Sequence, residues 1–320
     1  FTWQYCTHPN AGCAALAMFD GVSEVKAVDD RTIEIAFSEP KPYPYVPFVS
    51  STTPILQAAQ FKDCLGERMA QCTEQNFKPI GTGPYKVDEF LTNDIALYSI
   101  NPNFRLADKP HFAKVSIKGG GDPAGAARAV LETGEVDYAW NLQIAPDVLA
   151  AMAARGIGDP VVDYGAAVEF LFFNMTNPDP ALGAARSTAE GGVHPILGDI
   201  RVRQALAMAI DRTTLSEALY GDLGRPTCNV VPAPELYAST TTAGCETPDV
   251  ERAKALLDEA GWTDTNGDGI RDKDGRKLAL SFITSTNGVR QDTQMLIQQW
   301  WSEIGVQTEL RNIAASVFFG

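Results

Sequence analysis

Two segments limit what this chain can fold into more than any others. The first, residues 78–87, reads KPIGTGPYKV, and its alternating Gly and Pro residues indicate a tight turn that starts a strand. The second, residues 199–212, reads DIRVRQALAMAIDR and predicts a helix capped by Asp199. The apolar positions 202, 205, 206, 209 and 210 share one face of that helix, so it should pack against a core. Neither segment carries a catalytic group in a reactive arrangement.

Length and charge exclude several classes of protein. A chain of 320 residues is long enough for two lobes or one large domain, and 45% hydrophobic with 21% charged residues is an ordinary globular composition. The formal net charge of −14 argues against nucleic acid, because binding phosphates requires clustered Lys and Arg. It also disfavours adsorption to an anionic membrane surface. No run approaches the roughly 18 apolar residues that span a bilayer.

The cysteines fall into three local pairs: Cys6 and Cys13, Cys64 and Cys72, Cys228 and Cys245. Six cysteines allow 15 pairings, so the sequence does not fix the connectivity. Closure of each local pair is the simplest prediction, because each pair brackets a polar or Gly- and Pro-rich loop. Unrelated buried thiols are the alternative, whereas metal binding is disfavoured because no Cys-x-x-Cys is present. Disulfides would indicate an oxidising compartment such as the periplasm or the cell exterior.

Strand and helix patterns alternate along the chain, which predicts an α/β fold. Hairpins are expected within residues 25–37 and 85–100, and further strands at 112–118, 136–140, 168–174, 278–284 and 306–310. Helices are expected at residues 124–132, 146–155, 201–210, 213–220, 249–260 and 291–304.

Five segments in a fixed order carry a resemblance to a known family. They are the GTGPY turn at 81–85, Phe173-Asn174 with the later helix at 199–212, DVERAKALLDEAGW at 249–262, the polar loop at 264–275, and WWSEIGV at 300–306. Together they resemble the extracellular solute-binding protein family 5, which includes the dipeptide- and oligopeptide-binding proteins of ABC importers. One such motif would be a weak signal, but five in order are specific.

The resemblance implies a two-lobed, hinged α/β fold of the type II, peptide-binding class of periplasmic binding proteins. It further implies that residues 1–78 form part of an extra small α+β domain, residues 79–172 part of lobe I, and residues 173–320 part of lobe II. Both ends of the chain are then expected to be cuts within a longer protein.

The resemblance also implies a function in which the protein binds a ligand and catalyses no reaction. The expected protein is the substrate-binding component of an ABC importer, a monomer that captures a peptide or similar small solute by hinge closure and delivers it to the permease subunits. It would act in the periplasm or outside the cell, with or without a lipid anchor, and would need no cofactor or metal. An extracytoplasmic α/β hydrolase and a sensory solute-binding domain are the alternatives. The hydrolase has no specific support, because the histidines lie outside any triad or metal motif.

Candidate ligand-binding residues lie where two predicted strands end, since clefts in open α/β lobes form at strand ends. Trp140 offers a flat apolar surface with one donor, and Asn141 offers both a donor and an acceptor. We therefore predict ligand contacts from Trp140, Asn141 and Leu142, and from Asn174 at the end of the next strand. Burial of Trp140 beneath the following helix is the alternative.

Two loops partly match the sequence patterns of a calcium-binding loop and a phosphate-binding loop. The sequence favours an ordinary turn for both. Residues 264–275 partly fit a calcium loop, but position 12 is Gly275 instead of the bidentate Glu that such loops use. Residues 119–123 join a strand to a helix, yet they lack the Lys of a phosphate-binding loop and contain Asp122, which would repel an anion.

Overall fold

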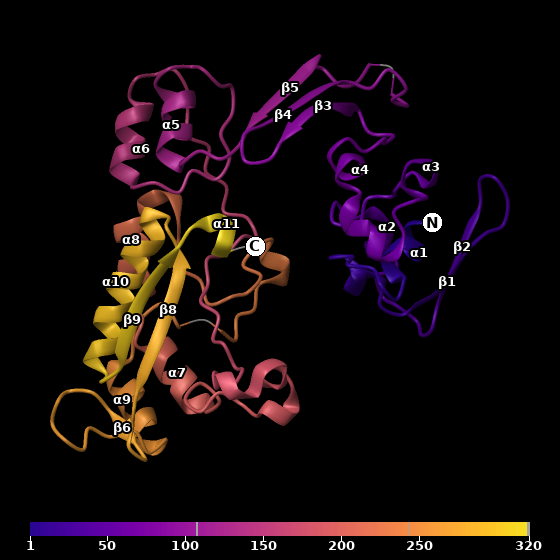
Figure 1. Cartoon of the computed structure of the whole chain (residues 1–320). Coiled ribbons are helices and arrows are strands. Elements are labelled where there is room, and N and C mark those ends of the chain that lie inside the picture. The colour runs from indigo at the N-terminus through magenta and orange to yellow at the C-terminus, as the bar shows by residue number, and fades with distance from the viewer. Residues whose placement is uncertain (107, 243, 319–320) are drawn as a thin grey trace. The chain divides into compact units, whose positions relative to one another are not determined.

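A computed structural model describes residues 1–106, 108–242 and 244–318 (Figure 1). By their internal contacts the residues form two compact units, Phe1–Gly121 and Asp122–Gly320.

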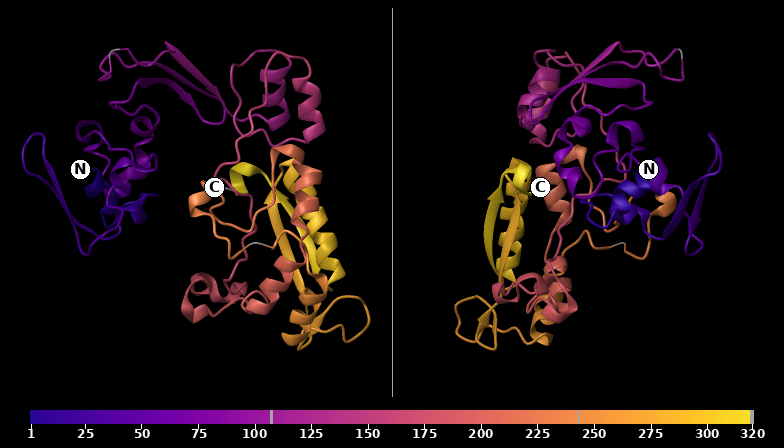
Figure 2. Two further views of the ribbon diagram at one scale, coloured as in Figure 1. Left: turned by 180° about the vertical axis from the view of Figure 1, so that it is seen from behind. Right: turned by 45° about the vertical axis from the view of Figure 1, so that its right-hand side comes forward.

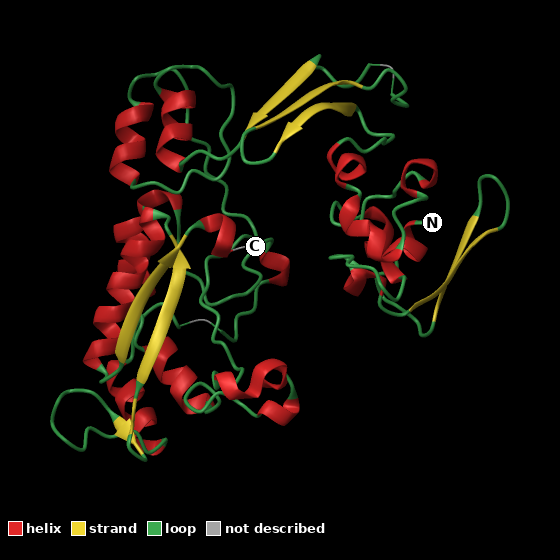
Figure 3. Cartoon of the chain, in the orientation of Figure 1, coloured by secondary structure: helices red, strands yellow, loops and turns green. Residues whose placement is uncertain are grey.

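The first unit combines short helices with two antiparallel sheets (Figure 3). Its helices are α1 (Thr2–Thr7), η1 (Leu16–Phe19), α2 (Val46–Val49), α3 (Ala58–Phe61), η2 (Gly66–Gln71) and α4 (Thr73–Phe77). Its strands are the hairpin β1 (Val22–Ala27) and β2 (Ile33–Phe37), followed by a sheet of β3 (Tyr85–Leu91), β4 (Ile95–Ile100) and β5 (Lys114–Lys118).

Two disulfides stabilise the helical part of this unit. Cys6–Cys13 and Cys64–Cys72 contribute to a small core that also buries Tyr5, Phe19 and Phe61. So few large side chains bury little apolar area, and short covalent loops therefore supply part of the stability that a larger core would give.

The second unit begins with a pair of helices. Asp122 caps α5 (Pro123–Leu131) by accepting a hydrogen bond of 2.8 Å from the amide of Gly125. This contact is the capped turn that the sequence predicts at this position. α6 (Pro146–Ala153) packs against α5 around Ala127, Leu131, Leu149 and Met152.

The rest of the second unit packs helices on a parallel strand pair (Figure 2). β8 (Ala279–Ser285) and β9 (Gln307–Ile313) are parallel and are joined by α10 (Gly288–Glu303). The other helices are η3 (Pro180–Ser187), η4 (Ala189–Gly191), α7 (Ile200–Met208), α8 (Arg212–Leu219), η5 (Gly221–Leu223), η6 (Glu235–Tyr237), α9 (Val250–Glu259) and α11 (Ala315–Phe318). A short hairpin, β6 (Asp272–Lys273) and β7 (Arg276–Lys277), precedes β8.

The main core joins α7, α9 and α10 to the parallel strands. Leu206 and Leu257 are fully buried in it, and the buried indole of Trp301 donates a hydrogen bond of 2.9 Å to the carbonyl of Leu206. Arg271 donates to the carbonyls of Trp262 and Ile304, which lie just beyond the last turns of α9 and α10. The helix ends are therefore held to the hairpin side of the core by a charged donor.

Two predicted strands do not form. Residues 136–140 and 168–174 are irregular, and no neighbouring strand pairs with either segment in the described part of the chain. Apolar runs favour a strand only where another backbone can accept and donate the ladder hydrogen bonds. The prediction of strands at these two places was wrong for this reason.

We expect the Leu206→Ala substitution to lower the free energy of unfolding by about 2–5 kcal/mol, because it leaves a cavity in the main core. Leu236→Ala is the matched control, since Leu236 is 84% exposed. The control should change stability by less than about 0.5 kcal/mol. Urea denaturation, monitored by tryptophan fluorescence, measures the free energy of unfolding of each variant. Equal losses in the two variants would contradict the assignment of Leu206 to the main core.

Candidate functional site

Trp140 lies on the surface of the second unit. Its side chain is 78% exposed, so the alternative in which α6 covers it is wrong. Asn141 follows with a φ of 56°, a left-handed conformation that Asn tolerates better than most residues. The pair therefore presents an exposed indole beside an exposed amide.

Leu142 is placed differently from its two neighbours. It is half-buried and packs against the cluster between α5 and α6. Its apolar side chain therefore anchors the Trp140–Asn141 turn to the helix pair, which leaves little of it for a ligand.

Asn174 is exposed, but its side chain is already engaged. Its Oδ1 accepts hydrogen bonds from the amide and the hydroxyl of Thr176, at 3.0 and 2.8 Å. Within the described ranges, no hydrogen bond or ring contact connects Asn174 with residues 140–142. Its amide nitrogen remains the group that could reach a ligand.

A cluster that sequence reasoning missed lies next to the Trp140 loop. Oε1 of Glu169 accepts hydrogen bonds from Nε2 of Gln143 and from a guanidinium nitrogen of Arg290, both at 2.7 Å. Asn287, the N-cap of α10, donates to the carbonyl of Gln143 at 3.5 Å. Burial, together with the charge of Glu169, raises the pKa of Tyr220 to about 12, and Arg290 opposes this rise.

A small hollow opens where α10 begins and β9 ends. It has a volume of about 250 Å³ and is lined by Gly288, Gln291, Asp292, Gln294, Met295, Leu310 and Asn312. The buried Gln294 donates to the carbonyl of Phe282 and accepts from Asn312, so the floor is fixed by hydrogen bonds. Ligands of open α/β folds bind at the carboxyl ends of strands. The predicted strand–helix–strand order of residues 278–310 is the signal that could have located this hollow.

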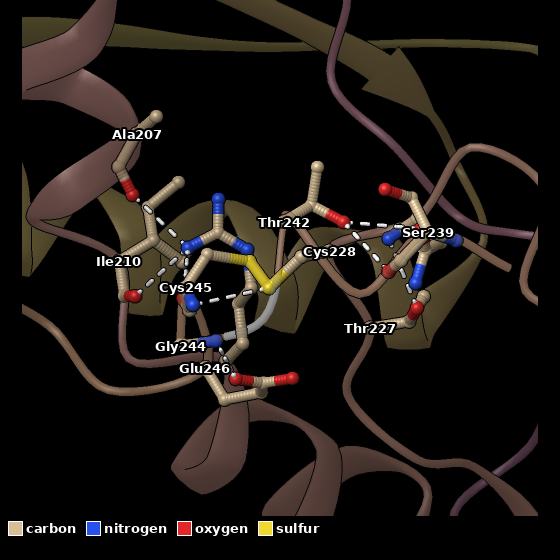
Figure 4. Close-up of a disulfide and its surroundings, with 11 residues drawn as sticks. Ala207, Ile210, Thr227, Cys228, Ser239, Thr242, Gly244, Cys245 and Glu246 are labelled. Atoms are coloured by element: carbon tan, nitrogen blue, oxygen red, sulfur yellow. Dashed lines mark hydrogen bonds between the residues drawn. A yellow bond between two sulfur atoms is a disulfide. The ribbon is translucent and has the colours of Figure 1, made fainter.

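The structure has disulfides at all three locally paired cysteine positions. Cys228–Cys245 closes a surface loop beside the end of α7, near Ala207 and Ile210 (Figure 4). Arg212 donates to the carbonyls of Ala207, Ile210 and Cys245, so a half-buried cation fastens one end of the loop. Burial lowers the pKa of Arg212.

The Asp- and Gly-rich loop at residues 264–275 is a self-contained turn. The carboxylate of Asp264 accepts from the amides of Gly267 and Gly269, and Asp268 pairs with Lys277 at 2.7 Å. Across the residues with described positions, no group of three or more His, Cys, Asp or Glu side chains could hold a metal ion. The geometry agrees with the turn that the sequence favours.

The family model for bacterial extracellular solute-binding proteins, family 5 Middle, matches residues 1–319. The chain belongs to this family. Family 5 proteins are extracellular binding proteins, and the five ordered motifs therefore identified the family correctly. In the part of the chain that the structure describes, every helix is too short or too polar to cross a bilayer.

Two relatives of this chain carry the names of peptide-binding proteins. A putative ABC transporter peptide-binding protein of Brucella ovis is 26% identical over 271 residues, covering 83% of this chain and 46% of the relative. The oligopeptide-binding protein AppA of Bacillus subtilis is 31% identical over 239 residues, covering 72% and 39%. The chain thus spans about half the length, or less, of these relatives.

The fold is that of type II peptide-binding proteins. The structure of Bacillus subtilis AppA in complex with a nonapeptide matches 100% of this chain and 59% of that one, with a TM-score of 0.78 and 22% identity. Lactococcal OppA, complexed with an endogenous peptide in the closed conformation, matches with a TM-score of 0.75 and 19% identity over 92% of this chain and 55% of that one. The predicted fold class is confirmed.

Removing the Cys228–Cys245 disulfide in the C228S/C245S variant should lower the free energy of unfolding by about 3 kcal/mol, because a 17-residue separation is no longer closed in the unfolded chain. Val230→Ala in the same loop is the control, since that side chain is 85% exposed. Chemical denaturation without reductant measures the difference. An unchanged midpoint in the double variant would show that the disulfide carries no stability.

Proposed function

We propose that the chain is part of the substrate-binding component of an ABC importer. It captures a peptide or similar small solute and passes it, chemically unchanged, to the permease subunits. The observation that carries this proposal is the match of the whole chain to a fold that holds a nonapeptide in AppA. The protein acts as a monomer outside the cytoplasm, either free or held by a lipid anchor.

We further propose the division into lobes that the sequence suggests. Residues 79–172 contribute to lobe I, residues 173–320 contribute to lobe II, and residues 1–78 belong to the extra small domain. Closure of the two lobes completes the set of ligand contacts, so ligand binding shifts the population toward the closed form. No step in this cycle forms or breaks a covalent bond.

Trp140 and Asn141 are the proposed ligand contacts of lobe I, with Asn174 and the hollow beside α10 on lobe II. The exposed indole supplies apolar contact area at a low entropic cost, and the amides can pair with a peptide backbone. A large aromatic that is exposed to this degree and tethered through Leu142 fits a binding surface.

Titration with an equimolar mixture of synthetic nonapeptides, followed by calorimetry, tests this proposal. Trp140→Ala should weaken binding about tenfold, because aromatic anchors dominate such interfaces. Tyr43→Ala is the matched control, since Tyr43 is an aromatic of the first unit that is 80% exposed. Wild-type affinity in the Trp140 variant would remove Trp140 from the site, and absence of binding by the unmodified chain would contradict peptide capture.

A further inference from the structure

Three segments that are distant in sequence meet at one carboxylate oxygen. Glu169 Oε1 accepts from Gln143 on the loop after Asn141 and from Arg290 in the first turn of α10. These partners lie 26 and 121 residues away along the chain. We refer to Gln143, Glu169 and Arg290 as the Glu169 latch.

The latch is partly shielded from water. The side chain of Arg290 is 23% exposed and that of Glu169 is 47% exposed. The charges of Glu169 and Arg290 shift the pKa of the half-buried Tyr220 in opposite directions, so this ring lies near both of them. An ion pair in such surroundings is stronger than a fully solvated one, and the second hydrogen bond from Gln143 fixes the direction of the carboxylate.

A second set of contacts, centred on Tyr164, joins the same two parts of the sequence as the latch. The hydroxyl of Tyr164 donates to the carbonyl of Asp222, and the guanidinium of Arg225 lies 4.7 Å from the centre of the Tyr164 ring. Both sets join a residue before position 172 to a residue after position 173. They therefore cross the proposed boundary between lobe I and lobe II at two separate points.

We propose that Glu169 is a positioning residue that holds the Trp140–Asn141 loop in place against the first turn of α10. This inference rests on the proposed function, since it assigns the loop to ligand capture. Gln143 is two residues beyond Asn141, and its backbone N–H donates a further hydrogen bond of 3.1 Å to the backbone carbonyl of Asn141. Fixing Gln143 therefore fixes the conformation of Asn141 and the direction of the adjacent indole. Without the latch the loop samples more conformations, and each ligand must order it on binding.

Hydrogen exchange measured by mass spectrometry tests the restraint without any ligand. Glu169→Ala should raise exchange about two- to fivefold in residues 141–145 and 287–291, because it removes both contacts of a partly exposed pair. Glu169→Gln should have a smaller effect, since its amide oxygen can still accept from Gln143. Reversing the pair in the E169R/R290E variant should restore protection, because the amide of Gln143 can turn its oxygen toward the new arginine.

The matched control is Glu259→Ala, which breaks the pair of Arg252 and Glu259 on α9, because Glu259 at 50% is about as exposed as Glu169 at 47%. It should leave exchange in residues 141–145 unchanged. Unchanged exchange in the Glu169→Ala variant would overturn the inference. Exchange that rises equally in β8 and β9 would overturn it as well, because Glu169 would then act only on global stability.

The same variants, titrated with the nonapeptide mixture, connect the restraint to capture. Glu169→Ala should weaken binding by the same two- to fivefold factor, approximately, as it raises local exchange. A local rise in exchange with unchanged affinity would refute the positioning role. If the unmodified chain binds no peptide while Glu169→Ala still loosens the loop, the proposed function fails and the restraint on the loop stands.

Discussion

The hydrogen bond from the indole of Trp301 to the carbonyl of Leu206 is the interaction on which the second unit depends. It joins α10 to α7 across 95 residues of sequence, inside a core that excludes water. A buried indole donor without this acceptor would cost free energy, so the two helices pack in one register. With α10 fixed in this way, its N-cap Asn287 and its first-turn residue Arg290 are held at a defined place beside the Trp140–Asn141 loop.

Local chemistry explains why much of the fold could be predicted from sequence. The strand Tyr85–Leu91 begins with alternating apolar and polar residues, the strand Ile95–Ile100 is mostly apolar, and a polar turn separates them. Asp122 and Asp199 begin helices because their carboxylates accept amide hydrogen bonds within three residues. The apolar runs at 136–140 and 168–174 carried no comparable signal, because a strand depends on a partner that local sequence does not reveal.

The candidate site was predictable only in part for the same reason. The sequence singled out Trp140 as the end of a strand, but that strand does not form, and the exposed side chain lies on an irregular segment instead. The pairing of Glu169 with Arg290 could not be predicted, since 40 acidic and 26 basic residues offer too many combinations and nothing local favours this one. Contacts across more than a hundred residues become visible only once α10 is packed on its strands.

Native mass spectrometry of the purified chain tests the central claim, capture without conversion, most directly. The account predicts an excess mass of a few hundred daltons or more that is lost on denaturation. It also predicts that an added peptide, once bound, is released with its mass unchanged. Release of a cleaved or modified peptide would contradict the account, because the proposed capture and delivery include no chemical step.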